Sequence, residues 1–236
     1  MKISVIIPMH NESNIIEKNA VILSQYLESH FDSYQLIFSD DGSNDGCGEL
    51  IKNLCLPHTE IIRSDENKGK GFAIRQGVAV ADGDVVIFTD ADLAYGTDVL
   101  AEAVKVLGES DCDILIGSRN TGRGGYGNYP KLRTLASKVY IWTLGKLFSL
   151  KYSDFQCGFK AFDGNCAKKI FSLGEINGFA FDLECLLLAQ KLGYKITEIP
   201  VKITTHKSSN VSVFKDSVGM LFDVIKIKRK IRKTLK

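Results

Sequence analysis

The sequence predicts a single α/β domain with a doubly wound, mostly parallel β-sheet flanked by helices. Short apolar runs without polar alternation, such as 85–88, are typical of strands that are buried on both faces. Before residue 93 the chain also repeats the order strand, acidic or polar turn, helix, which favours parallel strands around one crevice. With 236 residues, the chain is long enough to build a substantial core in one such domain.

The expected elements follow one another along the chain in alternating order. The expected strands cover residues 3–7, 34–39, 60–63, 85–88, 114–117, 154–162 and 197–203. The expected helices run from about 13 to 27, from the 40–46 turn to about 54, and over 72–81, 132–150, 182–192 and 216–233. Pro8 should end the first strand, and Asn11 or Ser13 should cap the first helix. The polar, Gly-rich segment 121–128 is expected to be a mobile loop.

Two carboxylates follow the buried run 85–88 directly: Asp90 and Asp92, separated by Ala91. In an open α/β sheet, ligands collect beyond the carboxyl ends of the strands. A D-x-D sequence at that position is suited to hold Mg²⁺ or Mn²⁺ against a diphosphate. The same residues would also serve as a helix N-cap followed by a surface acid.

Two further turns carry groups that suit a nucleotide. The segment 40–46, D-D-G-S-N-D-G, follows a strand and presents acids and helix-start amides, although such residues also suit ordinary turns and caps. The segment 67–71, N-K-G-K-G, precedes a helix and is expected to bind an anion through its amides and lysines.

The charge of the chain is divided unevenly. Residues 207–236 carry nine Lys/Arg and two Asp, a net charge of +7, which leaves −5 for residues 1–206. A basic segment of this kind favours an anionic partner, either a membrane or a nucleic acid. Because aromatic residues do not alternate with these cations, we expect an anionic membrane surface and no nucleic acid. We therefore divide the chain into a domain at 1–215 and a basic amphipathic helix at 216–236.

Both amphipathic helices leave two interpretations open. The helix expected at 216–233 places Met220, Val224, Ile227 and Ile231 on one face, which would lie either on a membrane or on its own domain. The helix at 132–150 carries Trp142 on a side that would lie in the core or at a lipid interface.

Composition restricts the compartment and the type of site. The six cysteines are scattered, without a C-x-x-C pair, which argues against a zinc site and against a disulfide framework. The sequence shows neither a signal peptide nor a run of 18 apolar residues. We therefore expect a protein of a reducing, cytoplasmic compartment that associates peripherally with the cytoplasmic face of a membrane.

Taken together, the motifs resemble those of glycosyltransferase family 2, whose members have the Rossmann-like GT-A fold. The resemblance covers nearly the whole chain and rests on V-I-I-P-M-H-N-E (5–12), S-D-D-G-S-N-D-G (39–46), N-K-G-K-G (67–71), T-D-A-D-L (89–93), I-G-S-R (116–119), D-F-Q-C-G-F-K (154–160) and F-D-L-E (181–184). The wording of K-G-K-G, Q-C-G-F-K and A-F-D-L-E is most similar to the branch that glucosylates or mannosylates dolichyl and other polyprenyl phosphates. His10 departs from the family, in which Tyr or Phe is frequent at that position, and the sequence has no transmembrane tail.

The resemblance implies roles for particular residues. The donor would be a nucleotide sugar of the UDP-glucose or GDP-mannose type, and the acceptor a polyprenyl phosphate. Asp90 and Asp92 would hold the metal, Mg²⁺ or Mn²⁺, and Arg119 and Arg133 the acceptor phosphate. The residues implied to contact the donor are Pro8, Glu12, Asp40, Asp41, Lys70, Asp90, Ala91, Asp92, His206 and Lys207.

The chemistry follows from the acceptor. A lipid monophosphate has a second pKa of about 6 and is already a dianion near neutrality, so inverting attack on the anomeric carbon needs no general base. A saccharide hydroxyl would need a carboxylate base, and Asp182 stands where soluble family members place it. Asp182 would serve equally well as a helix N-cap. A catalytically silent, membrane-docked nucleotide-sugar-binding module and a homo-oligomer also remain open.

Overall fold

The computed structural model describes residues 1–122, 125–126, 131–204 and 223–231, without the side chains of six residues in helix α5. Its strands are β1 (Ile3–Met9), β2 (Tyr34–Asp40), β3 (Thr59–Arg63), β4 (Val85–Phe88), β5 (Ile114–Ser118), β6 (Lys160–Asp163) and β7 (Ile196–Pro200). Its labelled helices are α1 (Ser13–His30), α2 (Cys47–Asn53), α3 (Lys70–Val80), α4 (Asp98–Glu109), α5 (Lys131–Phe148), α6 (Gly164–Leu173) and α7 (Phe181–Leu192). A further helix covers residues 223–231.

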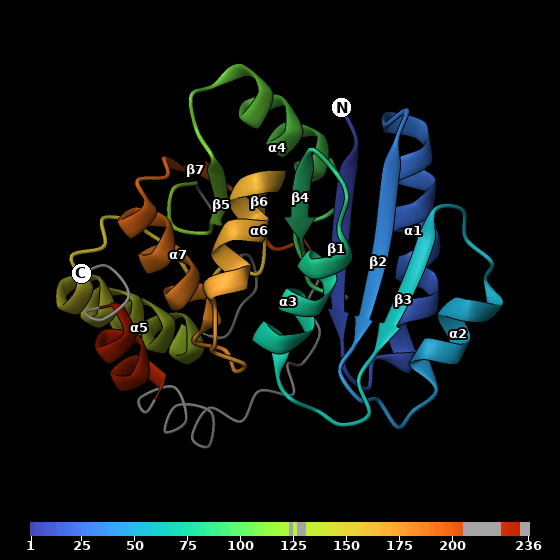
Figure 1. The fold of residues 1–236 in the computed structure, drawn as a ribbon, viewed down its shortest axis with the longest axis horizontal. Coiled ribbons are helices and arrows are strands. Elements are labelled where there is room, and N and C mark those ends of the chain that lie inside the picture. Colours follow the sequence, from blue (N-terminus) through green and yellow to red (C-terminus); the bar gives the residue numbers. More distant parts are fainter. Residues whose placement is uncertain (123–124, 127–130, 205–222, 232–236) are drawn as a thin grey trace.

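These strands form one mostly parallel sheet in the order β3-β2-β1-β4-β6-β5-β7 (Figure 1). Only β6 is antiparallel to its neighbours, β4 and β5. The predicted doubly wound α/β class is therefore confirmed. The chain builds outward from β1 through β2 to β3 and then returns to place β4 on the other side of β1. The topological switch point thus lies between β1 and β4, where ligands bind in sheets of this kind.

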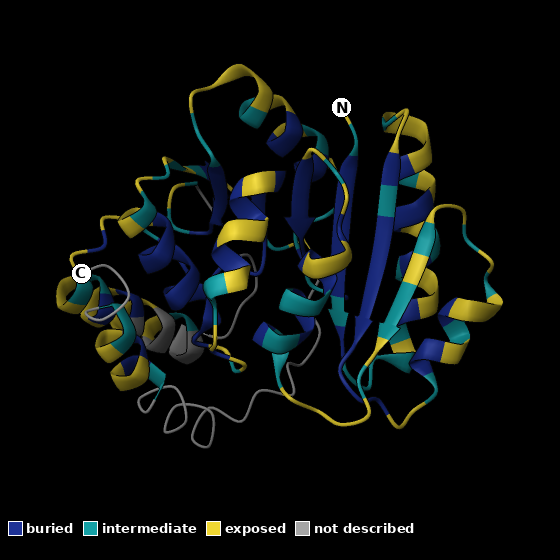
Figure 2. Cartoon of the chain, in the orientation of Figure 1, coloured by how far each residue is buried: buried dark blue, intermediate teal, exposed yellow. Residues whose placement is uncertain are grey.

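Helices cover both faces of the sheet, and each face has its own apolar core. Ile6, Val86 and Phe88 point to the face that packs α3, α6 and α7. Val5, Ile7 and Ile87 alternate with them and point to the face that packs α1, α2 and α4. Figure 2 shows the central strands buried over most of their length between these layers. The absence of polar alternation in the sequence results from this burial on both faces.

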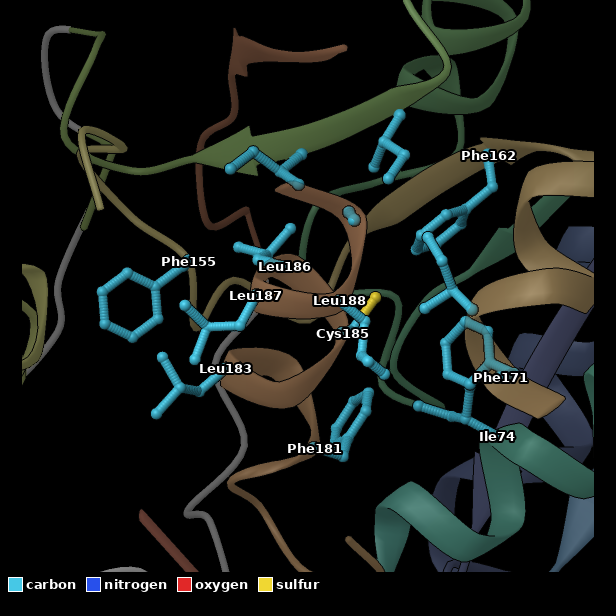
Figure 3. Packing of buried hydrophobic residues seen from close by; sticks show 14 of the residues in the cluster. Ile74, Phe155, Phe162, Phe171, Phe181, Leu183, Cys185, Leu186, Leu187 and Leu188 are labelled. Atoms are coloured by element: carbon cyan, nitrogen blue, oxygen red, sulfur yellow. The ribbon is translucent and has the colours of Figure 1, made fainter. Parts of the chain in front are cut away.

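Helix α7 is the most deeply buried helix and joins several elements. Every residue from Phe181 to Ala189 is buried. Figure 3 shows Phe181 and Cys185 of α7 facing Ile74 of α3, Phe171 of α6 and Phe162 of β6. The buried stretch of α7 is apolar apart from Asp182 and Glu184, and it lies inside the domain with the layers on this face packed around it.

The first strand continues past Pro8, contrary to the prediction that Pro8 ends it. Pro8 pairs with Ser39 of β2, and β1 ends at Met9. The ladder between β1 and β4 ends at Ile6 and Phe88. The missing N–H of Pro8 therefore removes no hydrogen bond from that ladder, and the strand tolerates the proline.

The predicted caps of α1, Asn11 and Ser13, are wrong. Glu12 occupies the N-cap position without a side-chain cap, and the Ser13 amide donates instead to Asp45 Oδ2 at 2.7 Å. Asn11 has a positive φ of 54° and accepts from the Asn44 amide at 2.9 Å. The 40–46 turn therefore supplies the cap for α1 from a distance in sequence, a contact that no local pattern reveals.

The expected strands at 154–162 and 197–203 are also partly wrong. Residues 154–159 form no strand, and β6 begins only at Lys160. Within 154–159, Asp154 and Gly158 bind side chains of the site instead, as described below. At the other strand, β7 ends at Pro200, although the Val201 amide still donates to Ser118 O at 2.9 Å.

Two helices, α4 and α6, were not predicted from the sequence. In α4, Val99, Leu100, Ala103 and Val104 are buried, a helical spacing visible in the sequence. For α6, Asp163 is an N-cap whose side chain accepts from the Asn165 and Cys166 amides. Both signals were present in the sequence.

The described part of the C-terminal helix packs on the domain. Val224 and Ile227 are 6% and 0% exposed and belong to the same core as α7, and Ile231 packs against it. Insertion of Val224 and Ile227 into a membrane is therefore wrong, because that face is already covered by protein. Met220 lies outside the described residues, as does half of the segment 121–128 that was expected to be mobile.

Helix α5 shows both of the expected environments on different sides. Ile141 and Leu144 are buried in the core, whereas Leu135, Val139 and Trp142 are 60%, 54% and 65% exposed. The side with Ile141 and Leu144 therefore belongs to the core. Contact of the exposed side with a lipid interface stays a prediction. None of the described helices combines the length and hydropathy that a bilayer-spanning segment needs.

The cap that Asp45 gives to α1 leads to a pH-dependent stability prediction. Burial alone would raise the pKa of Asp45, but hydrogen bonds from Ser13 and Cys47 outweigh it and lower the pKa from 3.8 to about 2. Because the folded pKa is the lower one, this stabilisation is present above about pH 4 and is lost as the pH falls toward 2. We expect Asp45→Ala to cost about 1 kcal/mol at pH 7, since solvent screens this exposed carboxylate.

Urea unfolding of both proteins at pH 7, 5, 4 and 3 measures this effect. The difference between wild type and Asp45→Ala should be constant from pH 7 to 5 and should shrink below pH 4. A difference that does not change with pH would show that the charge of Asp45 contributes nothing.

Candidate active site

The carboxyl ends of the parallel strands gather polar side chains at one edge of the sheet. His10 follows β1, Asp41 follows β2, Asp90 and Asp92 follow β4, and Arg119 follows β5. The antiparallel strand β6 begins at the same edge and brings Lys160 there. Most of the residues predicted from sequence are therefore collected on this edge, as the topology requires.

Lys70 is fixed on the first carboxylate of the D-x-D sequence. It is the first residue of α3, and its Nζ donates to Asp90 Oδ1 in a short ion pair. Burial would lower the pKa of Lys70, but Asp90, Asp182 and Asp92 together raise it above the ordinary lysine value. The ammonium is thus held in its charged form by three carboxylates on this edge.

Asp92 lies in a strongly anionic environment. Burial raises its pKa, and the nearby charges of Asp90 and Glu12 raise it further, against the opposing effect of Lys70. Asp92 Oδ1 accepts from the Ala94 amide at 3.0 Å. Ala91 between the two acids is held by Asn19, whose Nδ2 donates to Ala91 O at 2.8 Å. An added cation beside Asp90 and Asp92 would offset the repulsion that raises the pKa of Asp92.

Asp90 and Asp92 fit a divalent cation of the Mg²⁺ type. Within the described part of the chain, no three His, Cys, Asp or Glu side chains converge as a complete ligand set. Mg²⁺ commonly binds through one or two carboxylates and takes its other ligands from water and substrate phosphates. Two oxygen-donor acids at a partly open strand end therefore match this mode of binding.

Gly158 makes room for Asp90. A Cβ at residue 158 would lie 2.0 Å from Asp90 Oδ2, well inside contact distance. The Gly158 amide donates to Tyr95 Oη at 3.2 Å, which holds the loop in place. Burial raises the pKa of Tyr95 well above its ordinary value, so the hydroxyl stays protonated. Neither residue was assigned a role from sequence, although Gly158 lies in the quoted D-F-Q-C-G-F-K motif.

The two acids after β2 already hold protein groups. Asp41 Oδ1 and Oδ2 accept from the amides of Lys68 and Gly69 at 2.9 and 2.6 Å. Asp40 Oδ1 accepts from the Ser43 amide at 2.9 Å, and Asp40 Oδ2, which accepts no hydrogen bond, lies 3.7 Å from Arg63 Nη1. His10 Nδ1 donates to Asp41 O at 2.8 Å, and its Nε2 accepts from Asn11. Nucleoside binding by these acids stays a prediction.

Anion binding by the 67–71 turn stays a prediction, and four amides in and next to the turn already donate to protein groups. The amides of Lys68 and Gly69 donate to Asp41. Those of Gly71 and Phe72 donate to Asn177 O at 2.7 and 3.3 Å. These amides therefore bind acceptors of the protein itself, and the turn serves to position Lys70.

Arg119 is held by a buried acid. Its Nε and Nη2 donate to the two carboxylate oxygens of Asp154 at 2.6 and 2.9 Å, and its guanidinium lies 5.2 Å from the centre of the Tyr126 ring. This bidentate pair uses part of the fork assigned to the acceptor phosphate, so any phosphate must bind the remaining N–H groups. The backbone of Arg133 lies in α5, and its side chain is outside the described structure, as are His206 and Lys207.

Asp182 is paired with a fully buried lysine. Lys160 Nζ donates to Asp182 Oδ1 at 2.5 Å and to Cys157 O at 2.8 Å. Burial raises the pKa of Asp182, and the Lys160 and Lys70 ammonium groups offset part of this rise. The interpretation of Asp182 as an N-cap is wrong, because Ala180 holds that position in α7. A lysine within the apolar run 159–162 was a usable signal for a buried, paired cation.

The sequence pattern of the family described as Glycosyl transferase family 2 matches residues 4–171. The chain belongs to this family. The matched range includes both acids of the D-x-D sequence, Lys70 and Arg119, and it ends before Asp182 and the C-terminal helix. The residues gathered at this edge of the sheet are therefore the candidate active site of a glycosyltransferase.

Curated relatives cover nearly all of this glycosyltransferase. The chain is 29% identical to glycosyltransferase AglD of Haloferax volcanii over 93% of its own length. It spans only 36% of the length of that relative. It is 28% identical, over 96% of the chain and 73% of the relative, to a dolichyl-phosphate beta-glucosyltransferase of Dictyostelium discoideum. It is 30% identical, over 95% of the chain and 72% of the relative, to dolichyl-phosphate beta-glucosyltransferase ALG5A of Trichomonas vaginalis.

Solved structures share the fold. Glucosyl-3-phosphoglycerate synthase of Mycobacterium tuberculosis, crystallised with Mn²⁺, UDP-glucose and glycerol 3-phosphate, superposes with a TM-score of 0.70 at 20% identity, over 98% of this chain and 79% of that one. Mannosyl-3-phosphoglycerate synthase of Rubrobacter xylanophilus gives 0.68 at 17% identity, over 99% and 75%. The predicted GT-A fold is therefore confirmed.

The contact between Gly158 and Asp90 yields a prediction for this glycosyltransferase. Gly158→Ala places a methyl group where Asp90 Oδ2 lies, so the acid must move away from Lys70. We expect the affinity for Mn²⁺ with a nucleoside diphosphate to fall by roughly tenfold or more, as for other groups that orient a metal ligand. Isothermal titration of the variant with Mn²⁺ and uridine or guanosine diphosphate measures this loss.

Gly108→Ala is the matched control. A Cβ at Gly108 meets no atom within 4 Å, and the residue lies in α4. This variant should keep wild-type affinity and gain roughly 0.5–1 kcal/mol in stability. Unchanged affinity in Gly158→Ala would show that Asp90 tolerates the shift.

Proposed function

We propose that this chain is an inverting, metal-dependent glycosyltransferase that moves a hexose from a nucleotide sugar to a polyprenyl phosphate of the dolichyl type. Glycosyl transfer follows from family membership. The acceptor is inferred from the site and is consistent with the names of the dolichyl-phosphate beta-glucosyltransferases among the relatives.

The observation that carries the proposal is the state of Asp182. A hydroxyl acceptor needs a base that is free to take its proton. Asp182 is 6% exposed, and its Oδ1 is held by the Lys160 ammonium at 2.5 Å. A raised pKa by itself would suit a base, but an acid that is buried against a lysine is poorly placed to receive a proton from an acceptor. A phosphate dianion needs no such base, which favours the lipid phosphate.

The donor side of the reaction uses the D-x-D acids and Lys70. Asp90 and Asp92 would hold a divalent cation, which when bound supplies Lewis-acid stabilisation of the charge developing on the leaving diphosphate. Lys70 keeps Asp90 in place and contributes a positive charge at the same edge. An attacking phosphate that approaches opposite to the leaving group inverts the anomeric configuration.

The acceptor side would be formed by the arginines and α5. Arg119 lies at the end of β5 with part of its fork bound by Asp154. Arg133 lies in the first turn of α5, the helix whose outer face exposes Leu135, Val139 and Trp142. A helix that carries both an arginine and an exposed apolar face suits a substrate whose head is charged and whose tail is lipid. We infer that the enzyme meets this substrate at a membrane surface.

The experiment that tests the proposal is a screen of radiolabelled UDP- and GDP-sugars with a short polyprenyl phosphate and, in parallel, with free saccharides. The proposal expects chloroform-extractable label with one nucleotide sugar and the prenyl phosphate. Label transferred only to a saccharide would overturn it and restore Asp182 as a candidate base.

Metal dependence gives the next prediction. Asp92→Asn keeps the size of the side chain but removes one anionic oxygen donor for the cation. We expect turnover to fall by more than the roughly 10–100-fold typical of outer-shell partners, and thermal unfolding to stay close to that of the wild type. Initial rates with and without EDTA, at saturating prenyl phosphate, measure this. Activity that survives both the substitution and EDTA would contradict the metal assignment.

The arginines should act on the acceptor. Arg133→Lys keeps the charge but loses the bidentate fork, so the KM for prenyl phosphate should rise by roughly tenfold while the KM for the nucleotide sugar stays unchanged. Arg119→Lys should raise the same KM and also lower the Tm, because it breaks the buried pair with Asp154. Equal changes in both KM values for Arg133→Lys would refute this division.

A further inference from the structure

We propose that Glu184 and Lys230 are positioning residues that hold Lys70 on Asp90 through the loop 175–177. This inference rests on the donor site proposed above. Contacts between described residues connect the basic C-terminal helix to the active site.

Lys230 is the one cation of the helix 223–231 whose contacts in the described structure reach the buried interior. Its Nζ lies 3.0 Å from Glu184 Oε1 and 3.3 Å from Glu175 Oε1, and it also donates to Leu173 O in a short hydrogen bond. Its side chain is 14% exposed, whereas that of Lys226 on the same helix is 72% exposed. Lys230 therefore joins the C-terminal helix to α7 and to the segment after α6.

Glu184 links Lys230 to the loop 175–177 through hydrogen bonds. The residue is 2% exposed, and its Oε2 accepts from the amides of Glu175 and Ile176 at 2.9 and 2.8 Å. A buried carboxylate needs a countercharge, which Lys230 supplies. Loss of Lys230 would remove the cation that directly contacts Glu184 and leave Arg75 as its remaining nearby cation. The carboxylate would then shift toward the remaining cation or toward solvent, which would change its hydrogen bonds to the two amides.

The loop is in turn packed directly on the N-terminus of α3. Asn177 O accepts from the Gly71 and Phe72 amides. Arg75 of α3 donates to Ile176 O at 3.1 Å and to Asn177 Oδ1 in a short hydrogen bond. A Cβ on Gly69 or Gly71 would lie 2.5 Å from Asn177 O or Ile176 O, so no free space separates the loop from the helix. A displacement of the loop must therefore displace the first turn of α3.

The first turn of α3 carries Lys70, which holds Asp90. The series of contacts that begins at Lys230 therefore ends at Asp90, one of the two acids expected to hold the metal. Lys230 and Glu184 touch no reacting group themselves, so their effect on catalysis is through Lys70. The C-terminal helix is therefore part of the donor site's support, in addition to covering the apolar core.

The test compares Lys230→Met with Lys228→Met in the full chain. Lys228 is an exposed residue of the same helix, and its substitution removes the same charge from the basic segment. Amide hydrogen exchange over residues 69–75 reports the first turn of α3 without any assumption about activity. Isothermal titration with Mn²⁺ and uridine or guanosine diphosphate reports the donor site.

We expect Lys230→Met to raise exchange over 69–75 and to weaken diphosphate binding by roughly tenfold, the size typical of a supporting partner of a metal ligand. Lys228→Met should match the wild type in both measurements. Lys230→Arg, which keeps the cation, should restore most of the affinity, and Glu184→Gln should behave as Lys230→Met does.

A lower Tm in Lys230→Met with unchanged exchange at 69–75 and unchanged diphosphate affinity would overturn the inference, because Lys230 would then serve stability alone. If no diphosphate binds even to the wild type, the proposed donor site fails, and the exchange measurement still decides whether Lys230 orders α3.

Discussion

The structure depends on compensating the negative charge of the carboxylates that gather at one edge of the sheet. Asp90, Asp92 and Asp182 lie there in partly or fully buried positions, and burial alone raises the pKa values of Asp92 and Asp182. An uncompensated buried charge costs several kcal/mol, so each group requires a cation nearby. Lys70 and Lys160 supply two such cations, one on α3 and one on β6. The antiparallel direction of β6 is what brings Lys160 to this edge.

This balance also decides which groups remain available for chemistry. Lys160 is fully buried and holds Asp182, whereas the Lys70–Asp90 pair is partly exposed, at 21% and 33% for the two side chains. The buried Lys160–Asp182 pair therefore has a structural role. The partly exposed Lys70–Asp90 pair is the one that a substrate could reach. A divalent cation at Asp90 and Asp92 would compensate the remaining negative charge of these two partly exposed acids.

Several polar turns that look like ligand sites bind the protein itself. Asp41 holds the amides that precede α3, Asp45 caps α1, and Asn177 takes the first amides of α3. Backbone amides at helix starts need acceptors, and in this fold other loops supply them. The consequence is a set of loops locked to one another around the switch point, which gives Lys70 a fixed position.

The sequence by itself determined the fold class, most of the strands, and the location of the D-x-D acids at the end of β4. These follow from local information, since apolar runs and turn residues report burial and direction within a few positions. It also identified the family, because the motifs 39–46, 89–93 and 154–160 occur together in order.

Only the tertiary structure decided what the polar residues hold. The pairing of Lys160 with Asp182, of Arg119 with Asp154 and of Lys230 with Glu184 joins residues 22, 35 and 46 positions apart. Read locally, Asp182 was assigned as a cap or base and Arg119 as a phosphate ligand, and Lys230 belonged to a basic segment expected either on a membrane or on its own domain. Burial brings distant charges together and makes their pairing necessary, and this depends on packing that no short stretch of sequence encodes.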